Sequence, residues 1–170
     1  AGCEGNKDSI TVTINPLPTA PTVSDSIFYC VGATTYPLSA TGTGLKWYSA
    51  ETGGTGSSTA PTPSSASAGT TIYYVSQTNS YPCEGPRASI VVTVNSLPTA
   101  PTVTTPISYC MGATASALSA SGSGLRWYTV ASGGTGSSTA PTPSTASTGT
   151  TTYYVSQTSA ASCEGPRTAI

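Results

Sequence analysis

The sequence predicts an all-β protein built from tandem β-sandwich domains, and three observations lead to that prediction. The chain repeats itself with a period of 80 residues. Its apolar residues come in short alternating runs bounded by Gly, Pro and Ser clusters, which is the pattern of β-strands. No stretch carries an apolar stripe at helical spacing. A period as long as a small domain favours separate domains over a solenoid, whose units are about 20–50 residues long.

The repeat divides the chain into three parts. When residues 18–90 are aligned with 98–170, 49 of the 73 positions are identical. We therefore expect the end of an earlier repeat at 1–17, a complete repeat at 18–97, and a second repeat at 98–170 that lacks its last strand. The joints between repeats are rich in Pro, which favours short, semi-rigid, extended linkers.

Strand patterns recur inside each repeat. Residues 10–14 (Ile-Thr-Val-Thr-Ile) alternate strictly, so their apolar side chains should face a core, and residues 90–94 repeat the pattern. In the run 45–48, Leu45 and Trp47 share one face while Lys46 and Tyr48 share the other. Roughly seven short strands in each repeat are typical of a β-sandwich.

Two aromatic positions narrow this to an immunoglobulin-like sandwich. Trp47 lies in the predicted third strand, and the run 68–75 (Ala-Gly-Thr-Thr-Ile-Tyr-Tyr-Val) resembles the approach to a tyrosine corner at Tyr73. Val75 then stands where antibody domains place their second core cysteine. In the second repeat the corresponding core residues are Trp127 and Tyr153.

Composition excludes several classes of function. Charged residues are 6% of the chain, the net charge is −1, and His is absent. The few dispersed cations give no footprint for nucleic acid, and no apolar run is long enough to span a bilayer. No repeat brings together the carboxylates or imidazoles that acid–base or metal chemistry needs. We expect no enzyme activity and no cofactor.

One pair of opposite charges recurs, Glu84 with Arg87 and Glu164 with Arg167. It could form a ligand-binding turn, but we favour a salt bridge that pins the loop next to the cysteine. Tyr48 and Tyr74 are predicted to face outward, as are their counterparts Tyr128 and Tyr154. They could stack on sugars or simply pair across neighbouring strands.

The five cysteines have no metal-ligand spacing and therefore indicate disulfides. Two regular pairings are open. We favour a bond within each repeat, Cys30–Cys83 and Cys110–Cys163, which leaves Cys3 for a partner further upstream, because a small core gains stability from closing a long loop. The alternative joins neighbouring repeats as Cys3–Cys30 and Cys83–Cys110. Oxidised cysteines place the protein outside the cytoplasm.

The motifs together resemble a known family. The combination of YCVGAT (29–34), GLKWY (44–48), GGTGSSTAPTP (53–63), AGTTIYYVSQT (68–78) and CEGPR (83–87) is similar to the Ig-like repeats of giant cell-surface and secreted proteins of gliding Bacteroidota. The resemblance implies export by the type IX secretion system. It brings no catalytic residues with it.

The resemblance gives three expectations for function. The first is a stalk or filament of a large cell-surface adhesin in adhesion or gliding motility, with neighbouring repeats, the export machinery or surface polysaccharide as partners. The alternatives are a spacer in a secreted polysaccharide-degrading enzyme and a carbohydrate-binding module. The sequence Asp-Ser-Ile, at Ser9 and Ser26, also resembles the O-glycosylation site of secreted Bacteroidota proteins.

Overall fold

The computed structural model describes residues 1–170, and its regular elements are all β-strands. The chain forms two compact units whose segments interleave along the sequence. The first unit comprises Ala1–Ile27, Thr35–Pro63 and Thr70–Val92, and the second comprises Phe28–Thr34, Ser64–Gly69 and Thr93–Ile170. The second unit thus contains residues from one end of the first repeat together with the whole of the second repeat.

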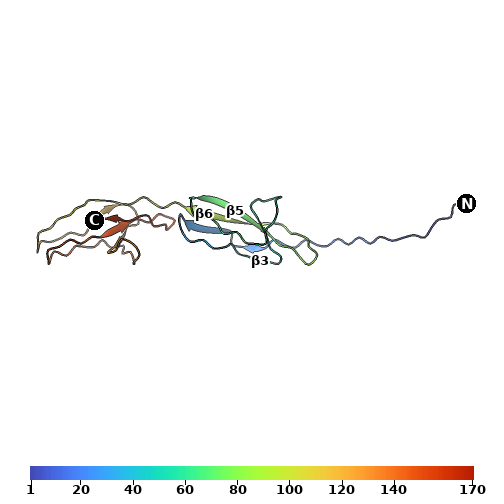
Figure 1. Cartoon of the computed structure of the whole chain (residues 1–170), viewed down its shortest axis with the longest axis horizontal. Coiled ribbons are helices and arrows are strands. Elements are labelled where there is room, and N and C mark those ends of the chain that lie inside the picture. The colour runs from blue at the N-terminus through green and yellow to red at the C-terminus, as the bar shows by residue number, and fades with distance from the viewer. The chain divides into compact units, whose positions relative to one another are not determined.

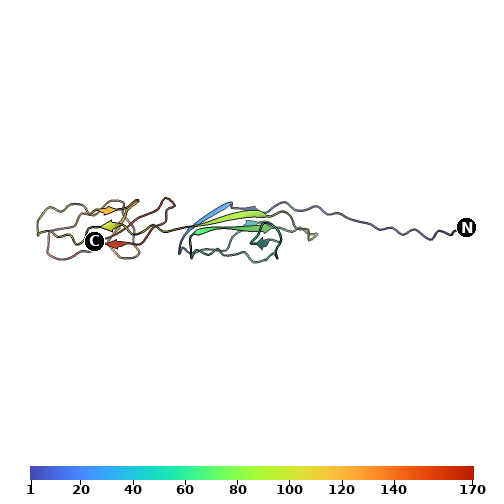
Figure 2. The same cartoon turned by 90° about the horizontal axis from the view of Figure 1, so that it is seen from above.

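Six strands form the first repeat. They are β1 (Thr22–Val23), β2 (Ser26–Cys30), β3 (Ala40–Thr41), β4 (Lys46–Tyr48), β5 (Gly69–Ser76) and β6 (Ala88–Asn95). The main sheet has the order β2-β6-β5-β4, and β1 pairs with β3 separately. The two longest strands, β5 and β6, lie side by side in both views (Figures 1 and 2).

The strand β6 supplies much of the buried surface of the first repeat. Its burial alternates as the sequence predicts, with Ile90, Val92 and Val94 at 0%, 1% and 7% exposure. Val75 in β5 and Trp47 in β4, which stand directly opposite each other, are equally buried. Burying branched apolar side chains at every second position is what fixes the register of such a sheet.

The second repeat has fewer and shorter strands. They are β7 (Thr102–Val103), β8 (Ala120–Ser121), β9 (Arg126–Tyr128), β10 (Tyr154–Ser156) and β11 (Thr168–Ala169). A three-stranded sheet has the order β11-β10-β9, and β7 pairs with β8. Leu118, Trp127 and Val155 form its core, with Tyr153 and Ile170 among the side chains packed against them.

The prediction of a buried strand at 10–14 is wrong for this chain. No strand forms in this segment, and Ile10, Val12 and Ile14 are 92%, 79% and 91% exposed. The equivalent residues 90–94 are buried because β2 and β5 flank them in the sheet. Residues 10–14 have no such neighbouring strands, so their alternating pattern has nothing to pack against.

The all-β fold class is confirmed. No helix of the structure is long and apolar enough to cross a membrane.

Candidate functional site

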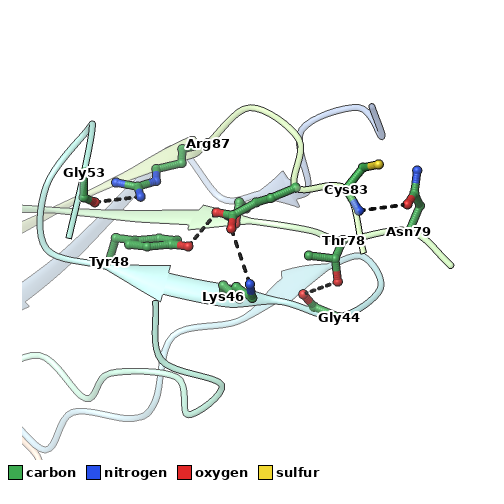
Figure 3. A network of polar contacts seen from close by, with 10 residues as sticks. Gly44, Lys46, Tyr48, Gly53, Thr78, Asn79, Cys83 and Arg87 are labelled. Carbon is green, nitrogen blue, oxygen red and sulfur yellow. Dashed lines mark hydrogen bonds and ion pairs between the residues drawn. The ribbon is translucent and has the colours of Figure 1, made fainter. Parts of the chain in front are cut away.

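A cluster of Tyr48, Glu84 and Arg87, here called the Tyr–Glu–Arg cluster, joins three parts of the first repeat (Figure 3). The Tyr48 hydroxyl donates a hydrogen bond to Oε1 of Glu84 at 2.5 Å, and the Ser76 hydroxyl donates to the same oxygen at 2.7 Å. Lys46 Nζ lies 3.4 Å from Oε2. Both carboxylate oxygens are therefore held by donors from β4 and β5.

Arg87 completes the cluster by stacking on the ring of Tyr48. Its guanidinium carbon lies 3.3 Å from the ring centroid of Tyr48, a cation–π contact. Its two terminal nitrogens donate to the carbonyl oxygens of Ala50 and Gly53 at 2.6 and 2.8 Å. Because those carbonyls belong to the loop after β4, Arg87 fastens that loop over the ring.

The second repeat builds the same arrangement. Tyr128 and Ser156 donate to Oε1 of Glu164 at 2.5 and 2.6 Å. The guanidinium of Arg167 lies 3.2 Å from the ring centroid of Tyr128, and its terminal nitrogens donate to the carbonyls of Val130 and Gly133. The recurrence shows that the local sequence dictates this geometry.

The hydrogen bonds keep both glutamates ionised. The donor from Tyr48, followed by that from Ser76, lowers the pKa of Glu84 below its ordinary value. Burial opposes ionisation of Glu164, but the hydrogen bonds from Ser156 and Tyr128 and the nearby arginine charges outweigh it and lower that pKa as well. Glu84 accepts through both carboxylate oxygens and Glu164 through Oε1, so both carboxylates hold neighbouring groups in place.

The charge pairs differ in detail between the two repeats. Arg167 Nε lies 4.0 Å from Oε1 of Glu164, so these two form a direct ion pair. In the first repeat the ion pair of Glu84 is with Lys46, while Arg87 binds the loop carbonyls and the ring. The contacts of both copies are those of a pinned loop.

The prediction that Tyr48 and Tyr128 face outward is wrong. They are 8% and 7% exposed. Strict alternation fails here for two reasons. The loop after β4 folds back, so that Trp47 and Ser57 exchange backbone hydrogen bonds. In addition, Arg87 covers the ring of Tyr48. Tyr48 lies directly opposite Tyr74 across the β4–β5 pair, which is the cross-strand arrangement.

The disulfide pairing differs from both predicted schemes. Cys30 is bonded to Cys163, and Cys3, Cys83 and Cys110 are free thiols. The bond links the end of β2 in the first repeat with the turn before β11 in the second repeat. Both residues belong to the second compact unit.

Strand geometry explains why a bond within the repeat fails. Val31, next to Cys30, donates its N–H to the carbonyl of Asn95, the last residue of β6. Cys83 instead lies in the turn before the start of β6, where Gly85 donates its N–H to the carbonyl of Gln77 just after the end of β5. A strand of eight residues spans roughly 24 Å, whereas the Cα atoms of a disulfide lie within about 6.8 Å. Cys30 and Cys83 therefore lie at opposite ends of the sheet.

The Pro-rich linkers are fastened to the loops before each cysteine turn. Gln77 Nε2 donates to the carbonyl of Thr19 at 2.9 Å, and Asn79 Nδ2 donates to that of Pro16 at 2.8 Å. Gly85 approaches the backbone of Pro18 so closely that a Cβ would collide with it. In the second unit Gln157 holds the carbonyl of Thr99 in the same way, at 2.7 Å.

The remaining predicted residues are placed as follows. Tyr73 is half-buried in β5, and Ser9 and Ser26 are exposed. The structure contains no group of three or more His, Cys, Asp or Glu side chains that could hold a metal ion.

These features together define a structural, repeating Ig-like β-sandwich, in which each copy fastens its own loops and linker. A family model described as an Ig-like domain that is CHU_C associated matches residues 18–95 and 98–170. The chain belongs to this family of Ig-like domains. A search of curated proteins finds no match.

Proposed function

We propose that this chain is a segment of the stalk of a large secreted cell-surface adhesin, which holds a binding or motile tip away from the cell. The single observation that carries the proposal is the Cys30–Cys163 bond. It ties two successive repeats together covalently, in addition to the peptide linker. An intramolecular disulfide also fits a protein that folds in an oxidising compartment.

The anchored linkers support the same role. A repeat whose linker is held by Gln77, Asn79 and the close contact at Gly85 has less freedom at its joint than a flexible coil would have. The Tyr–Glu–Arg cluster fixes a loop, and its ionised glutamate accepts from Tyr48, Ser76 and Lys46. Stiffness and resistance to extension are the properties that a stalk requires.

Single-molecule stretching between Ala1 and Ile170 tests this role. With the disulfide intact, only residues 1–30 and 163–170 can extend, to about 130 Å at ~3.5 Å per residue. With reductant, the whole chain of 170 residues can extend to about 600 Å. The double variant Cys30→Ser/Cys163→Ser should behave as the reduced protein does under both conditions. Equal extension of the oxidised and reduced wild-type chain would contradict the proposal.

Binding of carbohydrate is the competing role, and the arrangement of the tyrosines does not favour it. Tyr48 lies under Arg87 and against Glu84, so its ring has no open face for stacking on a sugar. A glycan array probed with the whole chain should be blank. Tyr74 is the half-buried cross-strand partner of Tyr48. Specific glycan binding that is lost in Tyr74→Ala would contradict the stalk role and support a carbohydrate-binding module.

The surroundings of the stalk form part of the proposal. We place the protein at the cell surface after type IX export, with surface polysaccharide as a neighbour and O-linked glycans on Ser9 and Ser26, whose side chains are exposed. Intact mass of the protein from its native host should exceed the sequence mass, and Ser9→Ala/Ser26→Ala should abolish the excess. An unmodified mass would end the glycan part of the proposal.

A further inference from the structure

Two Pro-containing linkers, the first at 16–19 and the second at 96–99, run past equivalent glutamines. Gln77 Nε2 donates to the last carbonyl of the first linker at 2.9 Å, and Gln157 Nε2 donates to the last carbonyl of the second linker at 2.7 Å. The amide oxygen of each glutamine accepts a backbone N–H of its own repeat, at 2.9 Å in both cases. Each glutamine is therefore fixed on one side by its repeat and holds the linker on the other.

One contact further upstream differs between the two repeats. In the first repeat, Asn79 Nδ2 donates to the carbonyl of Pro16 at 2.8 Å. The equivalent residues of the second repeat are Ser159 and Ser96, and no hydrogen bond joins them. The second repeat adds a contact only further downstream, where a threonine donates to the carbonyl of Pro101 at 2.8 Å. The first linker is thus held at both ends, whereas the second linker lacks a hydrogen bond at its start.

The side chain of Asn79 has two separate roles. Its Oδ1 accepts the N–H groups of Tyr81 and Cys83 at 3.0 and 3.3 Å, which caps the turn (Figure 3). Ser159 keeps this role, because its hydroxyl accepts the N–H of Cys163 at 3.2 Å. Only the amide nitrogen of Asn79 reaches a linker. Capping the turn and holding the linker can therefore be separated by mutation.

The backbone around the linkers is otherwise the same in both repeats. Gly85 and Gly165 each donate an N–H to the carbonyl of the glutamine in their own repeat, at 3.0 and 2.9 Å. A Cβ on either glycine would collide with the backbone of Pro18 or Pro98. Because both linkers pass their turns this closely, the carbonyl of Ser96 should be within reach of an asparagine on the second turn.

A second difference between the linkers acts in the same direction. Pro16 fixes its own φ and biases the residue before it toward extended conformations. Ser96, its counterpart, does neither. Both exchanges therefore leave Ser96 and Leu97 with fewer restraints than their counterparts in the first linker.

The Cys30–Cys163 bond spans the start of the second linker. On one side, the N–H that follows Cys30 is donated to the carbonyl of Asn95, the residue before this linker. On the other side, Cys163 lies two residues before the glycine that contacts Pro98. The disulfide is therefore a covalent restraint on the two residues between Asn95 and Pro98.

We propose that Ser96 and Leu97 form a hinge that the Cys30–Cys163 bond locks, and that the first linker needs no such lock because Asn79 holds it. Asn79 is thus a positioning residue, and reduction of the disulfide releases one linker while leaving the other in place. The proposal concerns the linkers alone and holds whether or not the array is a stalk. Its consequence is a joint whose stiffness depends on the redox state of its surroundings.

Release of the hinge requires a reductant, and a small dithiol such as dithiothreitol supplies it. One thiolate of the reagent attacks a sulfur of the Cys30–Cys163 bond, forms a mixed disulfide and releases the other cysteine as a thiolate. The second thiolate of the reagent then closes a ring and releases the remaining cysteine. The protein gains two electrons and two protons, and the reagent becomes a cyclic disulfide.

Backbone ¹⁵N relaxation of the full chain tests the hinge. The N–H groups of Leu17 and Leu97 report on it, since each shares a peptide plane with the carbonyl before it. In the oxidised protein both order parameters should be near the rigid value of about 0.85. With dithiothreitol, or in Cys30→Ser/Cys163→Ser, the value for Leu97 should fall below about 0.6 while that for Leu17 is unchanged. A Leu97 that stays rigid after reduction would overturn the proposal.

Removing the donor tests the role of Asn79. Asn79→Asp keeps an oxygen to cap the turn but loses the N–H group that holds Pro16. The Leu17 order parameter should therefore fall below about 0.6, with an unfolding midpoint in denaturant close to that of the wild type. Asn79→Ser, which installs the residue of the second repeat, should act alike. An unchanged Leu17 order parameter in both variants would show that this hydrogen bond does not hold the linker.

The converse exchange should replace the lock. In dithiothreitol, Ser96→Pro/Ser159→Asn should return the Leu97 order parameter to about 0.85. The matched control Ser96→Pro/Ser159→Asp carries the same proline but no donor, and it should leave Leu97 more mobile. Equal order parameters in these two variants would contradict the role assigned to the asparagine.

Discussion

The two repeats of this chain are nearly the same sequence in two different states. Residues 69–76 form the eight-residue strand β5, whereas 149–156, which differ only by Thr152 in place of Ile72, form a strand only at Tyr154–Ser156. Likewise 26–30 form β2, whereas 106–110 form no strand. The first repeat possesses residues 91–95 in the middle of its sheet. For 149–156, which differs from 69–76 at one residue, the missing partner strand therefore matters more than local sequence. For 106–110 the local sequence contributes as well, because Pro106 stands in place of Ser26 and has no N–H to donate to a sheet.

Adding a central strand to the second repeat should have the largest effect. Extending the chain after Ile170 by Val-Val-Thr-Val-Asn, the sequence of 91–95, should stabilise the second repeat by about 3–6 kcal/mol, because two valines become buried at about 1.5–3 kcal/mol each. Hydrogen exchange should show new protection across 106–110 and 149–153. The matched control, Val-Asp-Thr-Asp-Asn, places charges at the buried positions and should give neither result. Equal protection with both extensions would show that the central strand is not the cause.

Removing the glutamate of the Tyr–Glu–Arg cluster should have the next largest effect. Glu84→Gln should lower the free energy of unfolding of the first repeat by about 1.5–3 kcal/mol near neutral pH, the range for hydrogen bonds to a charged group. Glu164→Gln should act likewise on the second repeat. Denaturant titration measures both, with Glu51→Gln, an exposed residue, as the control.

The stabilising effect of Glu84 should depend on pH. Because the pKa of Glu84 is lowered in the folded protein, its stabilising contribution is complete above the unfolded-state pKa and is lost as the pH falls through the folded pKa. The difference in unfolding free energy between wild type and Glu84→Gln should therefore shrink in acid. A difference that grows as the pH falls would contradict the assigned hydrogen bonds.

Removing one donor should cost less. Tyr48→Phe and Tyr128→Phe each delete a hydroxyl that donates to a glutamate and should cost about 1 kcal/mol. The ring remains to pack against the arginine. In a double-mutant cycle, Tyr48→Phe should have much less effect in the Glu84→Gln background, and additivity of the two changes would rule out the contact as the source of stability.

The smallest effect is expected from Lys46. Its side chain is 45% exposed, and its nitrogen lies 3.4 Å from Glu84. Lys46→Met should cost about 0.5 kcal/mol or less, as is usual for exposed ion pairs, and the cost should disappear in high salt. A loss comparable with that of Glu84→Gln would mean that Lys46 is the main partner of the carboxylate.

The sequence predicts burial correctly where a residue packs against neighbours in its own repeat. The all-β class, the buried alternation of Ile90, Val92 and Val94, and the burial of Trp47 all follow from pattern and size. The burial of Tyr48 could not follow from alternation, because it depends on a loop that Arg87 draws over the ring. A signal was present, since the only cations of the second repeat recur at the positions of Lys46 and Arg87.

The disulfide is the clearest case in which the sequence pattern was insufficient. Both pairings predicted from it joined neighbouring cysteines along the chain, whereas Cys30 passes over Cys83 and Cys110 to reach Cys163. The choice depends on which end of a strand each cysteine occupies. That information resides in the sheet order, with Cys30 beside Asn95 at one end of β6 and Cys83 before its other end.

The Cys30–Cys163 bond also means that a single cut does not divide the molecule. A protease that cleaves any one peptide bond between residues 31 and 162 leaves both fragments attached to each other through sulfur. Exposed glycine-containing loops such as 51–55 can thus be nicked without releasing what lies beyond them. The two ends of the chain therefore stay connected after a single cut in the loop that the disulfide closes.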